Sequence, residues 1–188
     1  MTLRHSLALI LLALSACAPG APERVVEERP SAGPAPRGAT LLRQTMQRTH
    51  DAARAEVRQP PLAWDDALAA DAGRYAAEMA RTDRFEHAPL GQPPQGENLW
   101  TGTRGAYRYE EMAQHWIDEK RVFVNRPAPN FSTTGDYRHA GHYTQIIWSR
   151  TTRFGCAMAV GPRDDYLVCR YLPGGNVVGE RALPSGSN

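Results

Sequence analysis

The chain has 188 residues, of which 41% are hydrophobic, so its size suits one compact domain plus a tail rather than several domains. Its formal net charge of +2 falls to +1 when Arg4 is removed with the leader described below (2 − 1), and basic and acidic residues are interspersed. A nucleic-acid-binding protein needs a clustered basic face, so this class is excluded and no nucleic-acid partner is expected.

Residues 1–16 are predicted to be a signal peptide, because a positively charged start precedes the apolar run LALILLAL, which is too short to span a bilayer. The run ends in Leu14-Ser15-Ala16-Cys17, which resembles a bacterial lipobox, where the cysteine is lipidated and becomes the mature N-terminus. We therefore expect a lipoprotein held at the membrane through Cys17, since two or more acyl chains suffice for stable anchoring. The alternative is an ordinary secretory signal that carries a cysteine.

The next segment, residues 17–38, is expected to contain the lipidated cysteine and a tether. It is dense in Pro, Ala, Gly, Glu and Arg and has no periodic apolar face, which favours a semi-extended linker. Ala18 stands after the cysteine, where an aspartate is associated with retention at the inner membrane. If the cell has two membranes, we expect the domain in the periplasm, anchored to the outer membrane.

Two helices are predicted at the start of the globular part. Apolar residues at helical spacing indicate the first over about residues 40–58, where Pro60-Pro61 closes it. The second follows Trp64, with Asp65 as its N-cap, and keeps helical spacing to about Arg81.

A Gly- and Pro-rich stretch over residues 85–104 is predicted to be a loop. It contains His87, Glu97 and Trp100, which a plain surface loop does not require. We therefore treat its polar residues as candidates for a site.

A third helix is predicted over about residues 106–121. One of its faces carries four residues at successive spacings of three, four and three: Tyr109, Met112, Trp116 and Glu119. Glu119 thus continues an apolar stripe. Either it is a functional carboxylate, or it sits in the last turn and reaches water past the edge of the core.

The last third changes to short segments rich in β-branched and aromatic residues, TQIIW, FGCAMAV and YLVCRYL, which predict an antiparallel meander. His142 stands just before the first segment, and its residue type alone favours a satisfied structural histidine. Cys156 and Cys169 lie on the two arms of the final hairpin, at opposed or nearly opposed positions. In an exported protein we expect them to form a disulfide; the alternative is two buried free thiols.

Two of these segments together resemble a known family. GHYTQIIWSR and YLVCRYLPGGNV look like the two signature motifs of the CAP superfamily, the group of cysteine-rich secretory proteins, venom antigens and pathogenesis-related proteins. GENLW and the helix end WIDE match two further recurring segments of that family. The resemblance implies a CAP (SCP-like) domain over residues 39–181, followed by a short C-terminal tail, 182–188. It also implies an α+β fold: a three-layer α-β-α sandwich with a short antiparallel sheet.

The resemblance further implies that two histidines and two glutamates meet in a central cleft. Carried over by position, this tetrad is His87, Glu97, Glu119 and His142. The imidazoles of His87 and His142 are then candidate ligands for Zn²⁺ or another divalent metal, and each carboxylate can orient a ring or hold a metal-bound water.

Two functions follow from such a cleft. We favour a non-enzymatic extracytoplasmic module that binds a lipid, a cell-envelope component or a protein, because no G-x-S-x-G or other nucleophile motif accompanies the tetrad. The alternative is a metal-assisted hydrolase of peptide or envelope substrates, with Glu97 or Glu119 as the base. A third possibility is a purely structural polar network.

Overall fold

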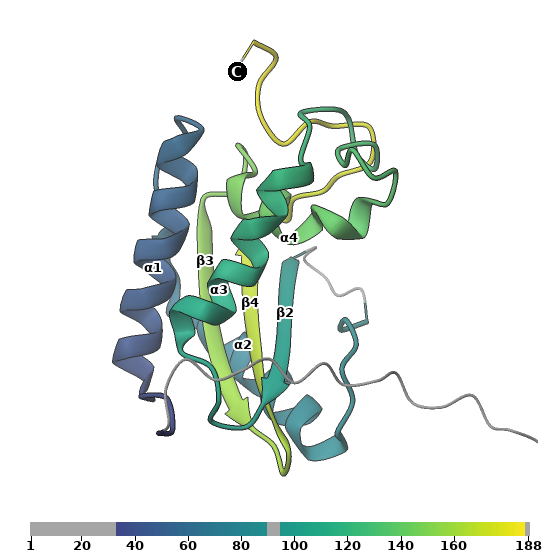
Figure 1. Cartoon of the computed structure of the whole chain (residues 1–188). Helices are drawn as coiled ribbons and strands as arrows, with labels where there is room; N and C mark the ends of the chain where they lie inside the picture. Colours follow the sequence, from purple (N-terminus) through teal and green to yellow (C-terminus); the bar gives the residue numbers. More distant parts are fainter. Residues whose placement is uncertain (1–32, 90–94, 187–188) are drawn as a thin grey trace, which may run out of the picture. The chain divides into compact units, whose positions relative to one another are not determined.

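The computed structural model describes residues 33–89 and 95–186. Within these two ranges the chain forms four α-helices, four strands and two 3₁₀ helices, in this order: α1 Ala39–Glu56, β1 Ala63–Trp64, α2 Asp66–Thr82, β2 Gly96–Thr103, α3 Tyr109–Ile117, η1 Asp118–Val122, η2 Tyr137–His139, α4 Gly141–Ile147, β3 Arg153–Val160 and β4 Asp164–Leu172 (Figure 1). The strands form one sheet in the order β1-β3-β4-β2. The short β1 is parallel to β3, and the remaining pairs are antiparallel.

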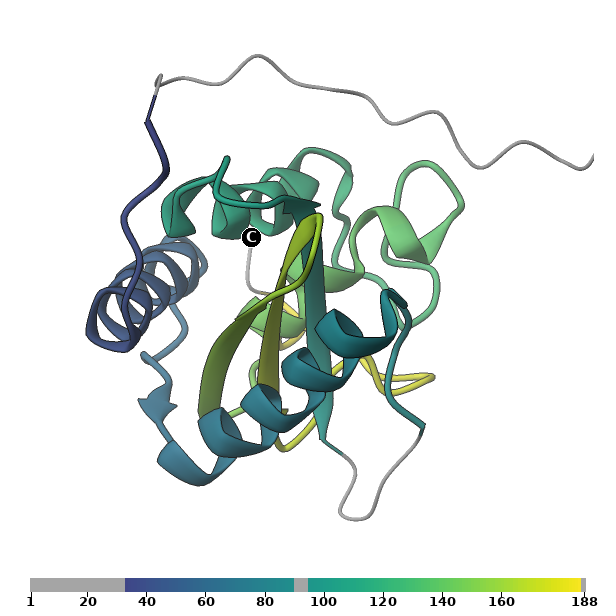
Figure 2. The same cartoon turned by 90° about the horizontal axis from the view of Figure 1, so that it is seen from below.

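Helices cover both faces of this sheet. Helix α2 packs on one face, where its alanines and Met79 meet Leu99, Tyr166 and Val168. On the other face, α1, α3 and α4 enclose the larger core, which includes Trp116, Trp148 and Phe154 (Figure 2). The expected α+β three-layer sandwich is confirmed.

The first two helices agree closely with the sequence prediction. Asp65 caps α2, because its carboxylate accepts hydrogen bonds from the amides of Ala67 and Leu68 at 2.9 and 3.1 Å. The start of α2 lies directly on β3: a Cβ added at Gly155 would stand 2.3 Å from the Ala69 nitrogen and 2.4 Å from the Asp65 carbonyl. Only glycine at position 155 therefore permits this approach of helix to strand.

Two predictions about local structure are wrong. The second half of the expected loop 85–104 is strand β2, which pairs with β4 over its whole length from Gly96↔Tyr171 to Thr103↔Asp164. The segment TQIIW is not a strand but belongs to helix α4, so His142 lies in the first turn of a helix. This helix is buried, and a short buried helix shows the same continuous apolar run as a buried strand.

A buried arginine of α1 contacts the C-terminal end of helix α4. The Arg54 guanidinium of α1 donates to the carbonyl oxygens of Ile146 and Trp148 at 2.9 and 3.0 Å and to that of Pro60 at 2.6 Å. A cation at the last carbonyls of a helix is favourable, because these groups have no partner inside the helix. Tertiary contacts thus override the β-preference of the isoleucines.

The third predicted helix ends earlier than expected. Helix α3 stops at Ile117, and the chain continues as the 3₁₀ helix η1, which carries Glu119. The tighter winding of a 3₁₀ helix changes where successive side chains point. Glu119 therefore belongs to a separate turn that lies beside the start of α4.

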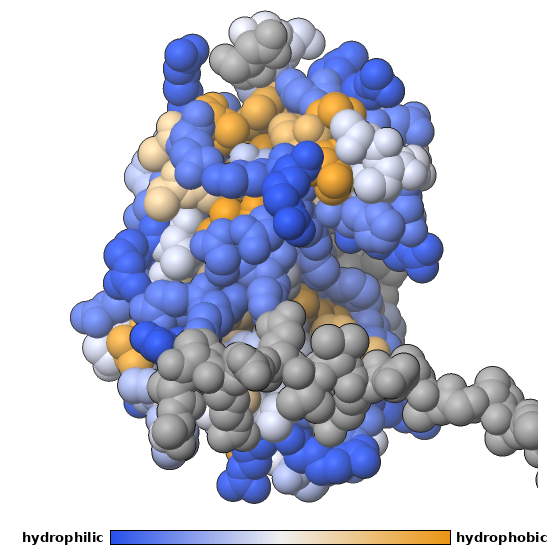
Figure 3. All heavy atoms as spheres, viewed as in Figure 1, coloured by the Kyte–Doolittle hydropathy of each residue, from blue (hydrophilic) through white to orange (hydrophobic). Residues whose placement is uncertain are grey.

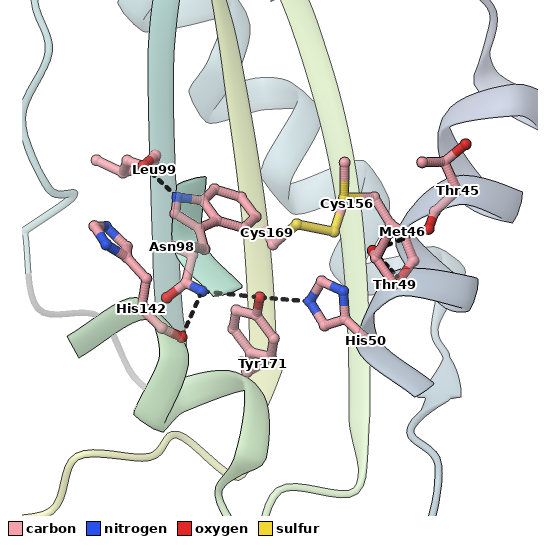
Figure 4. Close-up of a disulfide and its surroundings, with 11 residues drawn as sticks. Thr45, Met46, Thr49, His50, Asn98, Leu99, His142, Cys156, Cys169 and Tyr171 are labelled. Carbon is pink, nitrogen blue, oxygen red and sulfur yellow. Dashed lines mark hydrogen bonds between the residues drawn. A yellow bond between two sulfur atoms is a disulfide. The ribbon is translucent and has the colours of Figure 1, made fainter. Parts of the chain in front are cut away.

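The final hairpin carries the predicted disulfide. Cys156 and Cys169 are register partners on β3 and β4 and are covalently joined, with their Cα atoms 4.1 Å apart (Figure 4). The bridge lies inside the core and closes a loop of sequence separation 13. The expected pairing is confirmed.

The residues before α1 contact the domain. Ala35 is buried, and its amide donates to the Gly105 carbonyl at 3.0 Å. Arg37 forms an ion pair of 2.6 Å with the buried Asp165 and donates to the Tyr107 carbonyl. The end of the expected tether is thus fixed to the loop that follows β2. The predicted signal peptide and Cys17 lie outside the described residues.

The surface in Figure 3 is mainly hydrophilic, with apolar patches that are most evident in the upper half of the view. No helix within residues 33–89 and 95–186 is long and apolar enough to cross a membrane.

Candidate functional site

The first half of the candidate site joins the segment after α2 to the start of β2. The Nδ1 atom of His87 lies 2.6 Å from Oε1 of Glu97, and the Ala88 amide donates to the same oxygen at 3.1 Å. The second oxygen of Glu97 lies 2.9 Å from Nη2 of Arg170. The carboxylate is almost fully buried, with 8% of its side chain exposed, whereas 65% of the His87 side chain is exposed.

The second half joins η1 to α4. The Nδ1 atom of His142 lies 2.6 Å from Oε1 of Glu119, and Oε2 accepts from the amides of His142 and Tyr143 at 2.8 and 3.0 Å. The His142 ring also stacks on Trp116, with ring centroids 5.9 Å apart. Glu119 therefore caps the start of α4 and at the same time fixes the imidazole.

The two histidines contact their glutamates through the same ring nitrogen, Nδ1. A carboxylate accepts hydrogen bonds, so each Nδ1 carries the hydrogen that it donates to its glutamate. In a neutral ring the lone pair then lies on Nε2. Both rings are thus held in the tautomer that suits a metal ligand or a hydrogen-bond acceptor.

His87 and His142 line the same cleft. One part of the cleft, with a volume of about 560 Å³, has mainly apolar walls that include Pro129, Phe131 and Val178. The other part, about 480 Å³, runs past Phe85, Leu99 and Trp116 to Glu119. His87, Arg138 and His142 line both parts. The two parts of the cleft therefore adjoin at these three residues.

A buried hydrogen-bond chain supports the cleft from the core. The Asn98 amide donates to the His142 carbonyl at 3.1 Å and to the Tyr171 hydroxyl at 3.2 Å, and that hydroxyl lies 2.8 Å from Nε2 of His50 (Figure 4). The His50 ring has a backbone hydrogen bond to Met46, which favours hydrogen on Nδ1; Nε2 then accepts from the Tyr171 hydroxyl, whose oxygen accepts from Asn98. Burial lowers the pKa of His50 from 6.5 to about 3 and raises that of Tyr171 well above its ordinary value. The chain is neutral and links α1 to the backbone of His142.

The residues fit a divalent metal in their donor chemistry, but they supply few ligands. Two imidazoles facing one cleft, each with a carboxylate behind it, form the usual histidine arrangement of metal sites. Within the described part of the chain, however, no group of three or more His, Cys, Asp or Glu side chains is placed to hold a metal. A metal here would take His87 and His142 and complete its coordination with water or a bound ligand.

Several residues of the site were missed in the sequence. Arg170 pairs with Glu97 because the two are register partners on β4 and β2, and it also lies over the Tyr75 ring. Asn98 and Arg138 were also missed. Asn98 follows Glu97 in GENLW and points to the opposite side of the strand, so alternation along β2 is a signal that could have indicated it. No such local signal exists for Arg138, which lines both parts of the cleft and is paired with Asp136.

Comparison with known proteins identifies relatives of the chain. The CAP pattern, described as the cysteine-rich secretory protein family, matches residues 47–171. Pathogenesis-related protein 1C of Nicotiana tabacum is 36% identical over 132 residues, which cover 70% of this chain and 74% of that protein. The cysteine-rich venom protein VAR8 of Varanus acanthurus is 33% identical over 131 residues, covering 65% of this chain and 62% of that protein.

Solved structures share the same fold. A crystal structure of NaASP2 with Zn²⁺ matches with a TM-score of 0.64 and 22% identity, covering 85% of this chain and 92% of that one. BmVAL-1 matches with a TM-score of 0.62 and 20% identity, covering 86% of this chain and 88% of that one. The sequence pattern, the pathogenesis-related relatives and the three-layer fold lead to one conclusion: the chain belongs to the CAP family, the cysteine-rich secretory protein family.

Proposed function

We propose that the protein is an extracytoplasmic CAP-domain binding protein that captures its ligand in the cleft between His87 and His142. The observation that carries this proposal is the use of the two glutamates. Both oxygens of Glu119 and Oε1 of Glu97 accept hydrogen bonds from imidazole nitrogens and backbone amides. The remaining oxygen, Oε2 of Glu97, accepts no hydrogen bond from the described residues but forms an ion pair of 2.9 Å with Arg170. The two carboxylates therefore orient the imidazoles, the neighbouring backbone and Arg170, which is the arrangement expected of a site that binds.

The alternative, hydrolysis with Glu97 or Glu119 as the base, receives less support from the same contacts. A general base needs a carboxylate oxygen within hydrogen-bond reach of the attacking water. Here each oxygen that could serve already accepts hydrogen bonds or faces an arginine, and 8% and 15% of the Glu97 and Glu119 side chains are exposed. Binding without turnover is thus the function that the geometry favours.

We propose that a divalent metal such as Zn²⁺ organises the cleft through the Nε2 atoms of His87 and His142. The zinc in the crystal structure of NaASP2 belongs to that protein, and its presence there is a reason to test the same ion here. When bound, a metal supplies a positive charge and open coordination positions for an oxygen or nitrogen of the ligand. The apolar walls around Phe131 and Val178 favour a ligand that also has apolar parts, such as a lipid, an envelope component or a protein segment.

We also propose that the domain is exported and held at a membrane by a lipidated Cys17, at the outer membrane if the cell has two. The disulfide between Cys156 and Cys169 supports export, because such bridges persist in oxidising compartments. The secreted character of the family supports it as well.

Calorimetric zinc titration tests the proposed site. The full chain carrying Cys17→Ser, to remove the lipid, is compared with the same chain carrying His87→Ala and His142→Ala. The matched control is His139→Ala, which removes an exposed histidine that does not line the cleft. We expect the double variant to lose zinc binding and the control to retain it; unchanged affinity in the double variant would reject the ligand assignment.

The same samples are then screened for binding and cleavage of phospholipid vesicles, peptidoglycan and peptides. We expect saturable binding without turnover. Metal-dependent multiple turnover that disappears in Glu97→Gln or Glu119→Gln would instead establish the hydrolase.

A further inference from the structure

Strand β2 is the outer strand of the sheet on the cleft side. Its only strand partner is β4, so its opposite edge has no neighbour among the described strands. An unpaired edge presents a row of amide and carbonyl groups that can pair with another chain.

Three observations show which residues of β2 point their main chain to this outer edge. The Trp116 indole donates to the Leu99 carbonyl at 3.0 Å, which places that carbonyl on the outer side. Even-numbered residues, in contrast, direct their main chain inward, toward β4. The Arg104 amide, just after β2, donates to the Arg163 carbonyl, and Asn98 is the register partner of Cys169. The short Cα distance of the cysteine pair, 4.1 Å, is typical of a non-hydrogen-bonded pair, so the main chain of Cys169 faces Asn98. Glu97, Leu99, Thr101 and Thr103 therefore direct their amides outward.

The 480 Å³ part of the cleft lies along this edge. Its walls include Leu99 and Thr101 of β2, Phe85 before the strand, and Trp116 of α3. Phe85 is 50% exposed, so it offers apolar surface to a ligand at this wall. The Thr101 hydroxyl is buried, yet it has no hydrogen-bond partner among the residues that the structure describes. Both features suit a groove that receives a ligand with polar and apolar groups.

We infer that the cleft binds an extended polypeptide segment of a partner protein, which adds to the edge of β2 as a further strand. This inference rests on the proposed binding function and names its ligand class. A polypeptide is favoured over a lipid or a glycan because its amides and carbonyls repeat at the spacing of the outward groups on β2. The bound segment runs from the edge beside Thr101 toward His87 and His142, where the cleft continues into its apolar part.

The geometry of the edge also predicts how the bound segment pairs and which of its side chains are apolar. Its main chain pairs with the outward amides of Leu99 and Thr101, while the Leu99 carbonyl keeps its bond to Trp116. Alternate side chains point to the two sides of an added strand, so those on the side of Phe85 are apolar. The adjoining apolar walls at Phe131 and Val178 extend this preference past the histidines.

The test uses proline as a main-chain probe. Thr101→Pro removes an outward amide inside the groove without removing a bond to β4, and an edge strand tolerates proline at such a position. Thr103→Pro is the matched control, because it makes the same change two residues along the same edge, outside the groove. All samples carry Cys17→Ser, and thermal unfolding checks that both variants remain folded.

A positional library of acetylated and amidated hexapeptides is screened by fluorescence anisotropy against the full chain. For the tightest binder, we expect Thr101→Pro to weaken the affinity about tenfold and Thr103→Pro to leave it unchanged. We expect a similar loss when the peptide is N-methylated on alternate amides, which tests the same bonds without altering the protein. Amide shifts of Leu99 and Thr101 in NMR spectra locate the bound peptide.

No binding by any library member up to millimolar concentration, or equal binding of the N-methylated peptide, would overturn strand addition. The zinc titration separates this outcome from a failure of the proposed function. If the protein binds zinc but no peptide, only the proposed ligand class is rejected. If it binds neither zinc nor peptide, the proposed binding cleft is rejected as well.

Discussion

The buried His50 makes the stability of the fold depend on pH in a direction that the structure fixes. His50 is fully buried, stacks on Phe154 with centroids 4.5 Å apart and accepts a hydrogen bond from Tyr171 through Nε2. Protonation of Nε2 would break that bond and place an unpaired charge in the core. The pKa is accordingly lowered from 6.5 to about 3, mainly by burial.

The sign of the effect follows from proton linkage. Between pH 6.5 and about 3 the unfolded chain binds a proton at His50 and the folded chain does not, so the free energy of unfolding falls as the pH is lowered. Each pH unit within this window costs about 1.4 kcal/mol. Lowering the pH from 7.5 to 5 covers roughly 1.5 pH units of this window, because the window begins at the unfolded pKa. The free energy of unfolding should therefore fall by about 2 kcal/mol.

Urea unfolding of the protein and of His50→Gln at both pH values measures this loss. The amide of glutamine can still accept from Tyr171 but does not titrate, so we expect the variant to lose about 2 kcal/mol less stability on acidification. Acidic side chains also contribute to the pH dependence, and the comparison removes their common share. His139→Gln, at an exposed position, is the control. An identical pH dependence in the protein and in His50→Gln would refute the reasoning.

Three other changes test separate parts of the account. Replacing Cys156 and Cys169 by alanine should lower the free energy of unfolding by about 3 kcal/mol, measured by urea denaturation, because the loop of separation 13 is no longer closed; equal stability of the reduced and oxidised protein would contradict this. Arg54→Met should cost roughly 3 kcal/mol in the same assay, since the carbonyls of Ile146 and Trp148 lose their buried donor, whereas Arg58→Met, at an exposed position after the helix, should cost little. Cys17→Ser should abolish incorporation of a fatty-acid analogue during metabolic labelling; normal export of the unaltered protein without label on Cys17 would reject the lipoprotein prediction.

Features that depend on neighbouring residues were predictable from the sequence. The cap of α2 at Asp65 needs only amides two and three residues ahead, and the periodicity of α1 and α2 reports one buried face. The disulfide followed from the expectation that a hairpin brings its two arms together. The contacts of the four cleft residues, in contrast, join segments far apart in the chain and were expected only from the resemblance to the CAP family.

Features that depend on distant contacts were not predictable. TQIIW folds as a helix because Arg54 of α1 satisfies its last carbonyls and the core surrounds it on all sides. GENLW becomes a strand because β4 pairs with it, although the stretch before it is rich in Gly and Pro. The pairing of Glu97 with Arg170 depends on the register of these two strands, which no local pattern specifies.

The central claim is that the glutamates hold both imidazoles with Nε2 free to bind a metal in the cleft. Long-range ¹H–¹⁵N NMR spectra of the histidine rings test it most directly, because they distinguish Nδ1 from Nε2 in each residue. We predict that His87 and His142 both carry their hydrogen on Nδ1 at neutral pH, and that zinc shifts only their Nε2 resonances among the ring nitrogens of the protein. Hydrogen on Nε2 of either ring, or zinc binding that leaves both Nε2 resonances unchanged, would contradict the account.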